Sequence, residues 1–199
     1  MTASASNGWW AAVRAAMAAH APQTVAVDGR PAAAVLIALL PAGPEPHVLL
    51  TIRSQEVDHH KGEISFPGGM IEADEGPQAA ALREAWEEVG IRPDEVEVLG
   101  PLSHFVTRSG FHVRPFAGVL PRAPYDYRIS EVEVAGVLEV PLGHLLDEAN
   151  SAYYHTTLHG SEVIVREYLW GEHVVTGATA WMLRDFLRLV AARMGREHV

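Results

Sequence analysis

The sequence contains no cysteine among its 199 residues. Disulfide bonds, thiolate catalysis and cysteine-based zinc sites are therefore excluded. Lysine is almost as scarce, because Lys61 is the only one, and it lies in the segment HHKGE and not in a Walker-type loop. Phosphate binding by a P-loop is excluded as well.

Long hydrophobic runs are also missing. The run AAAVLIALL at 32–40 is less than half of the about 20 residues that are needed to span a bilayer. The N-terminus shows no basic region followed by an apolar one, which a secretion signal would have. We therefore expect a soluble, cytoplasmic protein that has no membrane partner.

Positive charge is in short supply, since 15 Lys and Arg residues face 25 Asp and Glu residues and the formal net charge is −10. Such a surface repels phosphate backbones, so we expect no nucleic-acid partner. If the protein handles phosphates, a metal ion must supply much of the positive charge. The length and the 48% of apolar residues are typical of one globular domain, taken as residues 1–199.

Apolar periodicity and turn residues predict a mixture of helices and strands. The expected helices are an N-terminal helical extension at about 8–20, a helix from Pro77 to Gly90, a short one at 141–148, and a last one at 178–194. The expected strands are 32–40, 47–53, 63–69, 94–102, 111–119, 132–140, 162–170 and 173–177, with the first two and the last two forming hairpins. This order predicts an α/β class protein, an α/β/α sandwich around a mixed β-sheet.

An acidic stripe marks the second predicted helix. The segment GGMIEADEGPQAAALREAWEEVGI, residues 68–91, carries six carboxylates and one cation, Arg83. At 100° per residue, three of the acids share an arc of about 100°. These acids are Glu84, Glu87 and Glu88. The opposite side, which we expect to face the core, holds Leu82, Trp86 and Val89.

The stripe has two interpretations. Most charge runs are solvated faces, but such a face usually mixes signs at i,i+4 spacing, and this one has no lysine. Gly68 and Gly69 precede the helix at a strand end, where bare backbone can approach a ligand closely. Mg²⁺ takes carboxylates, waters and substrate phosphates as ligands. The repulsion between the acids is then what attracts a cation.

The same residues resemble the Nudix box, here spanning 69–91. Gly69, Glu75 and the run REAWEEVGI at 83–91 match its fixed positions, with Ala85 as a small departure where a larger aliphatic residue is common. The resemblance implies the Nudix fold and hydrolysis, dependent on Mg²⁺ or Mn²⁺, of a nucleoside diphosphate linked to another group. It implies that metals are held by Glu84, Glu87 and Glu88 with help from the Gly69 carbonyl. It also implies a structural pair between Arg83 and Glu75.

Upstream, the stretch LLTIRSQEVDHHKGEISFPGG at 49–69 is similar to the signature of the coenzyme A pyrophosphatase branch. The segments 110–116, 133–142 and 177–183 resemble that branch too. The similarity implies cleavage of coenzyme A or its thioesters to 3′,5′-ADP and a 4′-phosphopantetheine product. Asp58 departs from the signature, because that position often holds an arginine. This keeps ADP-ribose, dinucleoside polyphosphates and nucleoside triphosphates open as substrates.

Hydrolysis of a diphosphate also needs a proton acceptor and contacts to the phosphates. Glu84 and Glu88 are the first choice as metal ligands, and Glu87 or Glu88 is the expected proton acceptor, with Glu133 as a weaker candidate. The substrate-binding candidates are Arg53, Lys61, Phe66 and Gly68. For Arg53 a structural salt bridge is the alternative, and for Lys61 a place on a surface loop.

Other residues have simpler explanations. The histidines His59, His60, His155 and His159 are interpreted as surface residues. Three further side chains either line the substrate pocket or belong to the core: Phe111, His112 and Phe116. Trp9 and Trp10 either pack the N-terminal helix or contact a second subunit in a homodimer. A Nudix-fold binding module without activity is the rival of another class, and it usually has a broken box.

Overall fold

The computed structural model describes residues 3–26, 29–55, 62–158 and 161–196. Its helices are α1 (Ala3–Ala19), α2 (Pro77–Val89), α3 (Leu142–Leu146) and α4 (Gly177–Arg193), with two short 3₁₀ helices, η1 (Pro93–Glu95) and η2 (Glu148–Asn150). Its strands are β1 (Ala32–Leu40), β2 (His47–Arg53), β3 (Ile64–Ser65), β4 (Gly68–Met70), β5 (Glu97–Pro101), β6 (Phe105–Val106), β7 (His112–Val119), β8 (Val134–Pro141), β9 (Ser151–Leu158), β10 (Ser161–Trp170) and β11 (His173–Val175).

The larger sheet is mixed, because β1 and β7 run parallel while the other strand pairs in its described residues are antiparallel. Its strand order is β3-β2-β1-β7-β5, with β4 on β1, β6 on β7 and β8 on β2. β1 and β2 pair only at Leu39↔Val48 and Leu40↔His47. Beyond that point β3 pairs with β2 and β4 pairs with β1. The two short strands therefore lie where β1 and β2 separate.

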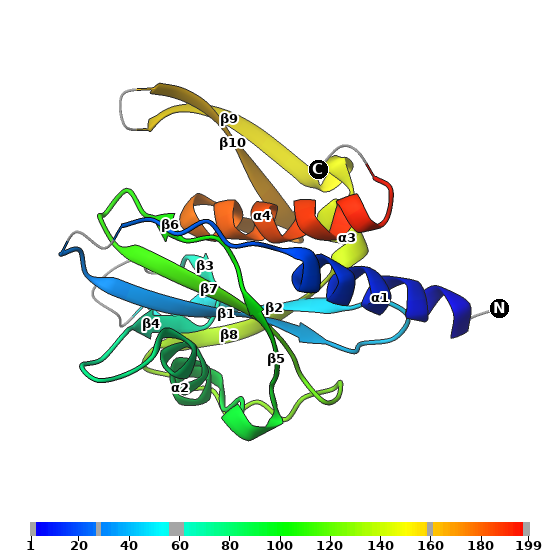
Figure 1. Ribbon diagram of the computed structural model, residues 1–199, viewed down its shortest axis with the longest axis horizontal. Helices are drawn as coiled ribbons and strands as arrows, with labels where there is room; N and C mark the ends of the chain where they lie inside the picture. Colours follow the sequence, from blue (N-terminus) through cyan, green and yellow to red (C-terminus); the bar gives the residue numbers. More distant parts are fainter. Residues whose placement is uncertain (1–2, 27–28, 56–61, 159–160, 197–199) are drawn as a thin grey trace.

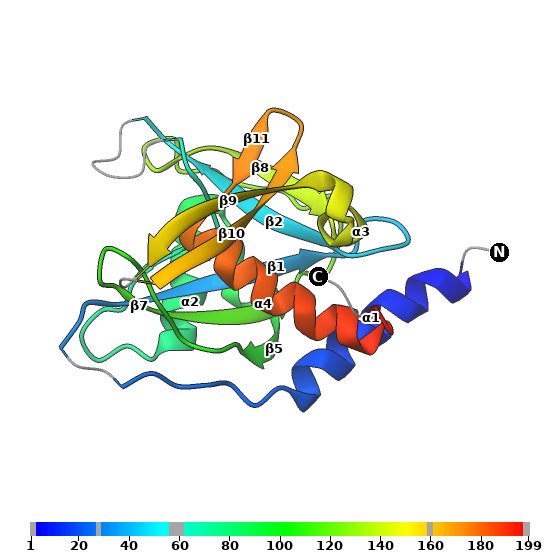
Figure 2. The same ribbon diagram turned by 90° about the horizontal axis from the view of Figure 1, so that it is seen from above.

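Helices cover both faces of this sheet, as Figure 1 shows: α2 lies on one face, and α1 and α4 lie on the other. A smaller sheet of β9, β10 and β11 lies over α4 (Figure 2). Alternate residues of β1 enter two core clusters, with Ile37 and Leu39 in the cluster towards α4 and Leu36 and Leu40 in the cluster towards α2. A strand buried on both faces reads as a continuous hydrophobic run, as 32–40 does. The predicted α/β/α sandwich with a mixed sheet is confirmed.

The prediction for the core side of the second helix was wrong at Trp86. This side chain is 38% exposed, and the Arg128 guanidinium lies 4.6 Å from its ring centroid. The fully buried residues of α2 are instead small or β-branched: Ala80, Ala81, Ala85 and Val89. Small side chains let a helix pack closely on a sheet, so the alanines, and not the indole, face β1.

The strands differ from the prediction in three places. β6 was not predicted. The expected strand 63–69 is interrupted at Phe66 and Pro67 and becomes β3 and β4. β9, which pairs along its length with β10, was not predicted. His155 lies on β9 and is exposed, and His159 lies outside the described residues.

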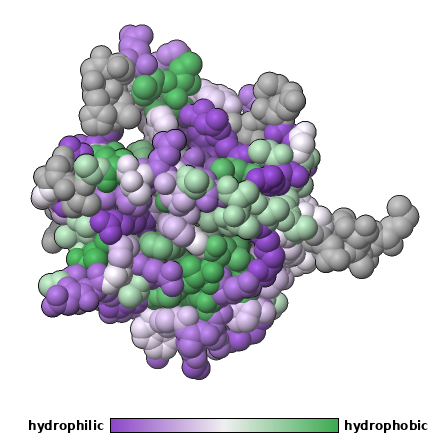
Figure 3. Space-filling model, in the orientation of Figure 1, coloured by the Kyte–Doolittle hydropathy of each residue, from purple (hydrophilic) through white to green (hydrophobic). Residues whose placement is uncertain are grey.

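The ring side chains for which the sequence left two locations open are packed within this chain. Trp9 and Trp10 pack against the core cluster between the sheet and α4, as does Phe111. His112 is 1% exposed and Phe116 is 8% exposed, so both belong to the interior. In Figure 3, hydrophobic residues reach the surface in the lower middle of the view, where β5 crosses the sheet. None of the helices in the described residues is long and apolar enough to cross a membrane.

Candidate active site

The helix α2 carries the predicted acids and is fixed at both ends by its sequence. Pro77 occupies the start of the helix, where its missing N–H costs nothing. Gly90 ends it with φ 74° and ψ 20°, and its N–H donates to the Trp86 carbonyl at 3.0 Å. This left-handed conformation suits glycine, so the sequence itself sets where the helix stops.

Two carboxylates of α2 meet the backbone of β4. A Cβ atom added to Gly69 would lie 2.5–2.6 Å from the carboxylate atoms of Glu84, which shows how closely that carboxylate covers the glycine. The Gly68 N–H donates to Glu88 Oε2 at 3.2 Å. Glu84 and Glu88 are one helical turn apart, so both reach the same strand. The pair of glycines thus forms the floor of an acidic site.

The three acids of the stripe have different surroundings. Glu88 is 4% exposed as a residue, and the Glu84 side chain is 15% exposed. The Glu87 side chain is 49% exposed. The solvated-face interpretation therefore fits Glu87 but not Glu84 or Glu88.

The pKa of Glu88 is raised to about 8, mainly by burial. The Gly68 N–H and Arg53 favour the charged form and oppose this shift, and the nearby charges of Glu84 and Glu133 add to it. The pKa of Glu84 is also raised, mainly by burial, although hydrogen bonds from Arg83 oppose this. Carboxylates that are desolvated and close together are costly to ionise unless a cation joins them. The site is therefore electrostatically prepared for a positive charge.

Arg83 ties the loop before α2 to the helix. Its Nε and Nη2 donate to the two carboxylate oxygens of Glu75, each at 3.0 Å, and Nη2 also donates to the Met70 carbonyl at 3.0 Å. The pKa of Glu75 is lowered by this contact, and that of Arg83 is raised. The pairing that the resemblance implied is present in the structure. Bidentate contacts of this kind fix orientation as well as distance.

The same guanidinium also reaches the acidic stripe. Arg83 Nη1 donates to Glu84 Oε1 at 3.0 Å and to Glu87 Oε2 at 2.8 Å. Sequence reasoning missed these two contacts, although the i,i+4 spacing of Arg83 and Glu87 could have indicated one of them. The stripe is thus partly neutralised from within its own helix.

Two charged residues flank the site from the neighbouring strands. Arg53 ends β2, and its charge lowers the pKa of Glu88. Its buried Nε has no hydrogen-bond partner among the described residues. Glu133, immediately before β8, is exposed, but its charge raises the pKa of both Glu84 and Glu88. The site therefore has a cation and a further acid at its border.

The other substrate-binding candidates are placed differently. The Phe66 side chain is 2% exposed and belongs to the core cluster towards α4, so it is not presented to the acids. Gly68 lies at the site through its backbone. Lys61 and Asp58, with His59 and His60, lie outside the described residues.

The residues present fit a divalent metal ion by their chemistry. Carboxylate and carbonyl oxygens are the donors that Mg²⁺ and Mn²⁺ prefer. Within the described part of the chain, no three acidic or histidine side chains are already grouped closely enough to hold an ion. The contacts explain this, because Arg83 holds Glu84 and Glu87 while the Gly68 N–H holds Glu88. A bound cation would compete with Arg83 for these oxygens.

A model of a known protein family matches this chain. The NUDIX domain model matches residues 29–162, which is more than half of the chain. The chain belongs to the Nudix family. It is therefore a Nudix hydrolase, an enzyme that acts on phosphorus anhydrides of the nucleoside diphosphate type. Nudix hydrolases generally use divalent metal ions, which agrees with the oxygen donors of this site.

Individual relatives agree with the Nudix assignment. The sequence is 38% identical over 162 residues to proteins named "Uncharacterized Nudix hydrolase NudL" from Yersinia pestis and Yersinia pseudotuberculosis, covering 80% of this chain and 79% of theirs. A MutT protein from Methanosarcina mazei superposes with a TM-score of 0.52 at 19% identity, covering 90% of this chain and 100% of that one. A MutT/nudix family protein from Enterococcus faecalis gives 0.54 at 14% identity, with 86% and 70% covered. The two structural matches support the Nudix fold.

Proposed function

We propose that this Nudix hydrolase cleaves the diphosphate of coenzyme A or its thioesters, giving 3′,5′-ADP and a 4′-phosphopantetheine product. The observation that carries the hydrolytic part is the convergence of the Glu84 and Glu88 carboxylates on the backbone of Gly68 and Gly69. A buried acidic pair against bare backbone is a suitable place for a metal ion and a phosphate group.

In this proposal Mg²⁺ or Mn²⁺ is held by Glu84 and Glu88, with Glu87 as third acid and the Gly69 carbonyl oxygen as a further ligand. Such an ion would supply charge neutralisation for the phosphates and a more acidic bound water. If a cation displaced Arg83 from the acidic stripe, the ion pair between Arg83 and Glu75 would remain. That pair uses Nε and Nη2 of Arg83, whereas only Nη1 contacts the stripe. The loop before α2 therefore stays in place.

The remaining roles follow from position. Glu87 or Glu88 accepts the proton of the attacking water, and Glu133, whose charge also reaches Glu88, is the weaker candidate for this role. Arg53 contacts a substrate phosphate, since its charge already reaches Glu88 and its buried Nε has no partner among the described residues. Lys61, which lies outside the described residues, is proposed as a further phosphate contact from the sequence alone.

The choice of coenzyme A rests on the sequence signature at 49–69 and not on a contact of the site. Within that stretch Arg53, Phe66, Gly68 and Gly69 match the branch, and Asp58 departs from it. An acid in place of a cation near a polyanionic substrate weakens binding. ADP-ribose is therefore the substrate against which coenzyme A must be compared.

A product assay tests the proposal. Coenzyme A, acetyl-coenzyme A, ADP-ribose, diadenosine tetraphosphate and ATP are each incubated with the full chain and Mg²⁺, then again after chelation with EDTA. We expect 3′,5′-ADP from the first two substrates with the highest kcat/KM of the panel, and no release in EDTA. A higher kcat/KM for every nucleotide than for coenzyme A would show that coenzyme A is not the substrate of this enzyme. Binding without hydrolysis of any compound would support the non-catalytic module instead.

A further inference from the structure

A cavity lies on the opposite side of the sheet from the acidic site. Its volume is about 730 Å³, and it is bounded by α1, α4 and the segment that joins β5 to β6. None of its lining residues belongs to α2 or β4. Small-molecule sites commonly have volumes of about 300–1,000 Å³, so the cavity is large enough for a ligand.

One face of α4 forms a wall of this cavity along most of the helix. The lining residues of α4 recur at helical spacing: Trp181, Asp185, Arg188, Leu189 and Ala192. The rise of about 1.5 Å per residue separates Trp181 from Arg188 by about 10 Å along the helix axis. The cavity is therefore elongated, and its two ends can differ in chemistry.

The end near the C-terminus of α4 is cationic. Arg188 and Arg193 line it from α4, and His20 lines it from the end of α1. Among the residues that the structure describes, neither arginine has an ion-pair partner, whereas four others do: Arg14, Arg83, Arg92 and Arg122. Asp185 is the only acid of the lining. Two arginines against one acid give this lining a net positive charge, in a chain whose formal net charge is −10.

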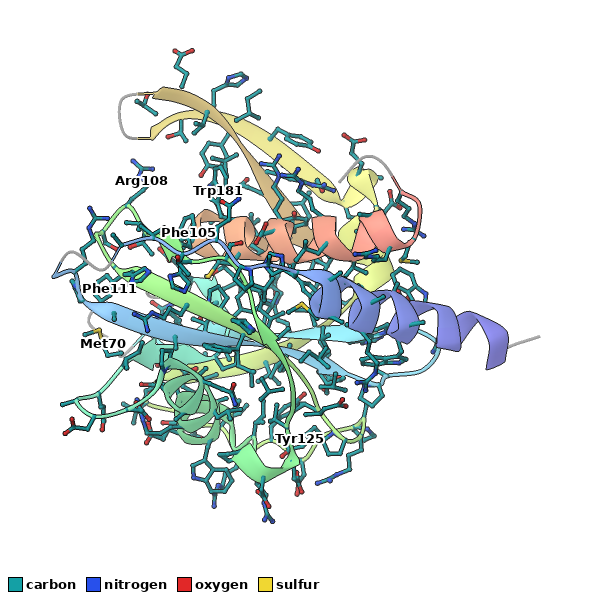
Figure 4. The ribbon with its side chains drawn as sticks, in the orientation of Figure 1. Met70, Phe105, Arg108, Phe111, Tyr125 and Trp181 are labelled. Carbon is teal, nitrogen blue, oxygen red and sulfur yellow. The ribbon has the colours of Figure 1, made fainter. Side chains whose placement is uncertain are left out.

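The other end is mainly apolar and aromatic, although His104 also lines it beside Phe105. Trp181 and Phe105 line it, with their ring centroids 6.3 Å apart and the ring planes 27° from parallel. Figure 4 shows these two side chains next to each other where α4 begins. Leu102 and Met182 complete this end. Because the two rings already stack on each other, they offer an apolar wall rather than a stacking partner for a planar ligand.

We propose that this cavity binds an amphipathic organic anion, of the class of a medium-chain carboxylate. The carboxylate lies between Arg188 and Arg193, and the alkyl chain extends along α4 towards Trp181 and Phe105. The charged head of such a molecule matches the cationic end, and its alkyl chain matches the apolar end. The alkyl chain is about one to two helical turns long, which matches the separation of the two ends. This site is independent of the acids on α2 and of the substrate proposed for them.

Titration calorimetry on the full chain tests the chemistry of the ligand. Octanoate is expected to bind with one site per chain. Octylamine, which has the same body and the opposite charge, and acetate, which has the head alone, are expected to show no saturable binding. Equal affinity for octylamine would show that the arginines do not select the head group, and no binding of octanoate would show that the cavity is not a site for this class. Either result overturns the proposal.

Matched variants test the location. Ala19 and Ala18 are both exposed on α1, but only Ala19 lines the cavity. Ala19→Trp is therefore expected to abolish octanoate binding, and Ala18→Trp to leave it unchanged. The double variant Arg188→Gln/Arg193→Gln should weaken binding by about tenfold or more, whereas Arg196→Gln, outside the lining, should not. Binding that persists in Ala19→Trp, or that is lost in Glu88→Gln, would place the anion elsewhere and overturn the assignment.

Discussion

Replacing Glu88 with glutamine is expected to lower turnover by roughly 100-fold or more, because the variant loses a carboxylate that we propose as a metal ligand. The fold should survive, since an amide oxygen can still accept the Gly68 N–H that now lies 3.2 Å from Glu88 Oε2. The residue is 4% exposed, so the neutral amide also removes the cost of a buried charge. The measurement is kcat and KM with saturating Mg²⁺, together with the thermal midpoint of unfolding.

Glu97→Gln provides the control for this variant. Glu97 lies on β5, its side chain is 54% exposed, and it forms an ion pair with Arg14. Exposed ion pairs contribute little to stability, and this one lies outside the acidic site. We expect Glu97→Gln to keep the activity of the parent protein. Normal turnover in Glu88→Gln, or an equal loss in both variants, would remove Glu88 from the proposed role.

Gly69→Ala is the second variant with a large expected effect. It removes no functional group and acts only by moving the Glu84 carboxylate. The new methyl group would lie 2.5–2.6 Å from the Glu84 carboxylate atoms, so this side chain must move away. The far end of a flexible glutamate moves easily, so the thermal midpoint should change little. The displaced carboxylate can no longer meet Glu88 above β4, and we expect turnover to fall by about 10- to 100-fold. Steady-state kinetics and thermal unfolding on the same sample separate the two effects.

The neighbouring glycines make this prediction specific. A methyl group on Gly68 would overlap the Ala34 carbonyl oxygen and the Val35 Cα, which belong to backbone and cannot move away. Gly68→Ala is therefore expected to lower the thermal midpoint strongly. A methyl group on Gly76 would meet nothing within 4 Å, so Gly76→Ala should resemble the parent protein in both measurements. Full activity in Gly69→Ala would contradict the placement of Glu84.

Much of the fold could be predicted from local signals in the sequence. The run at 32–40 is continuously apolar because β1 is buried on both faces, and Pro77 and Gly90 mark the ends of α2. β9 was missed because its sequence SAYYHTTL is polar and aromatic, and it becomes a strand by pairing with β10. Trp86 was assigned to the core because it lies on the side of the helix opposite the acidic stripe, but the alanines determine which side of α2 faces the sheet.

The sequence predicts that the three acids share one side of a helix, but it does not predict their electrostatic surroundings. The spacing of Glu84, Glu87 and Glu88 places them on one arc of a helix, whatever the tertiary structure. Their exposure depends on how α2 is rotated against β1 and β4, and it separates buried Glu88 from exposed Glu87. The influence of Glu133 depends on the path of the chain between β7 and β8, which no local pattern records.

The most direct test of the account is the anomalous density of Mn²⁺ in crystals of the protein grown with that ion. The account predicts a peak at about 2.0–2.2 Å from carboxylate oxygens of both Glu84 and Glu88, with Arg83 still paired to Glu75. A manganese peak elsewhere, with Glu84 still bound to Arg83 and Glu88 still bound to the Gly68 N–H, would contradict it.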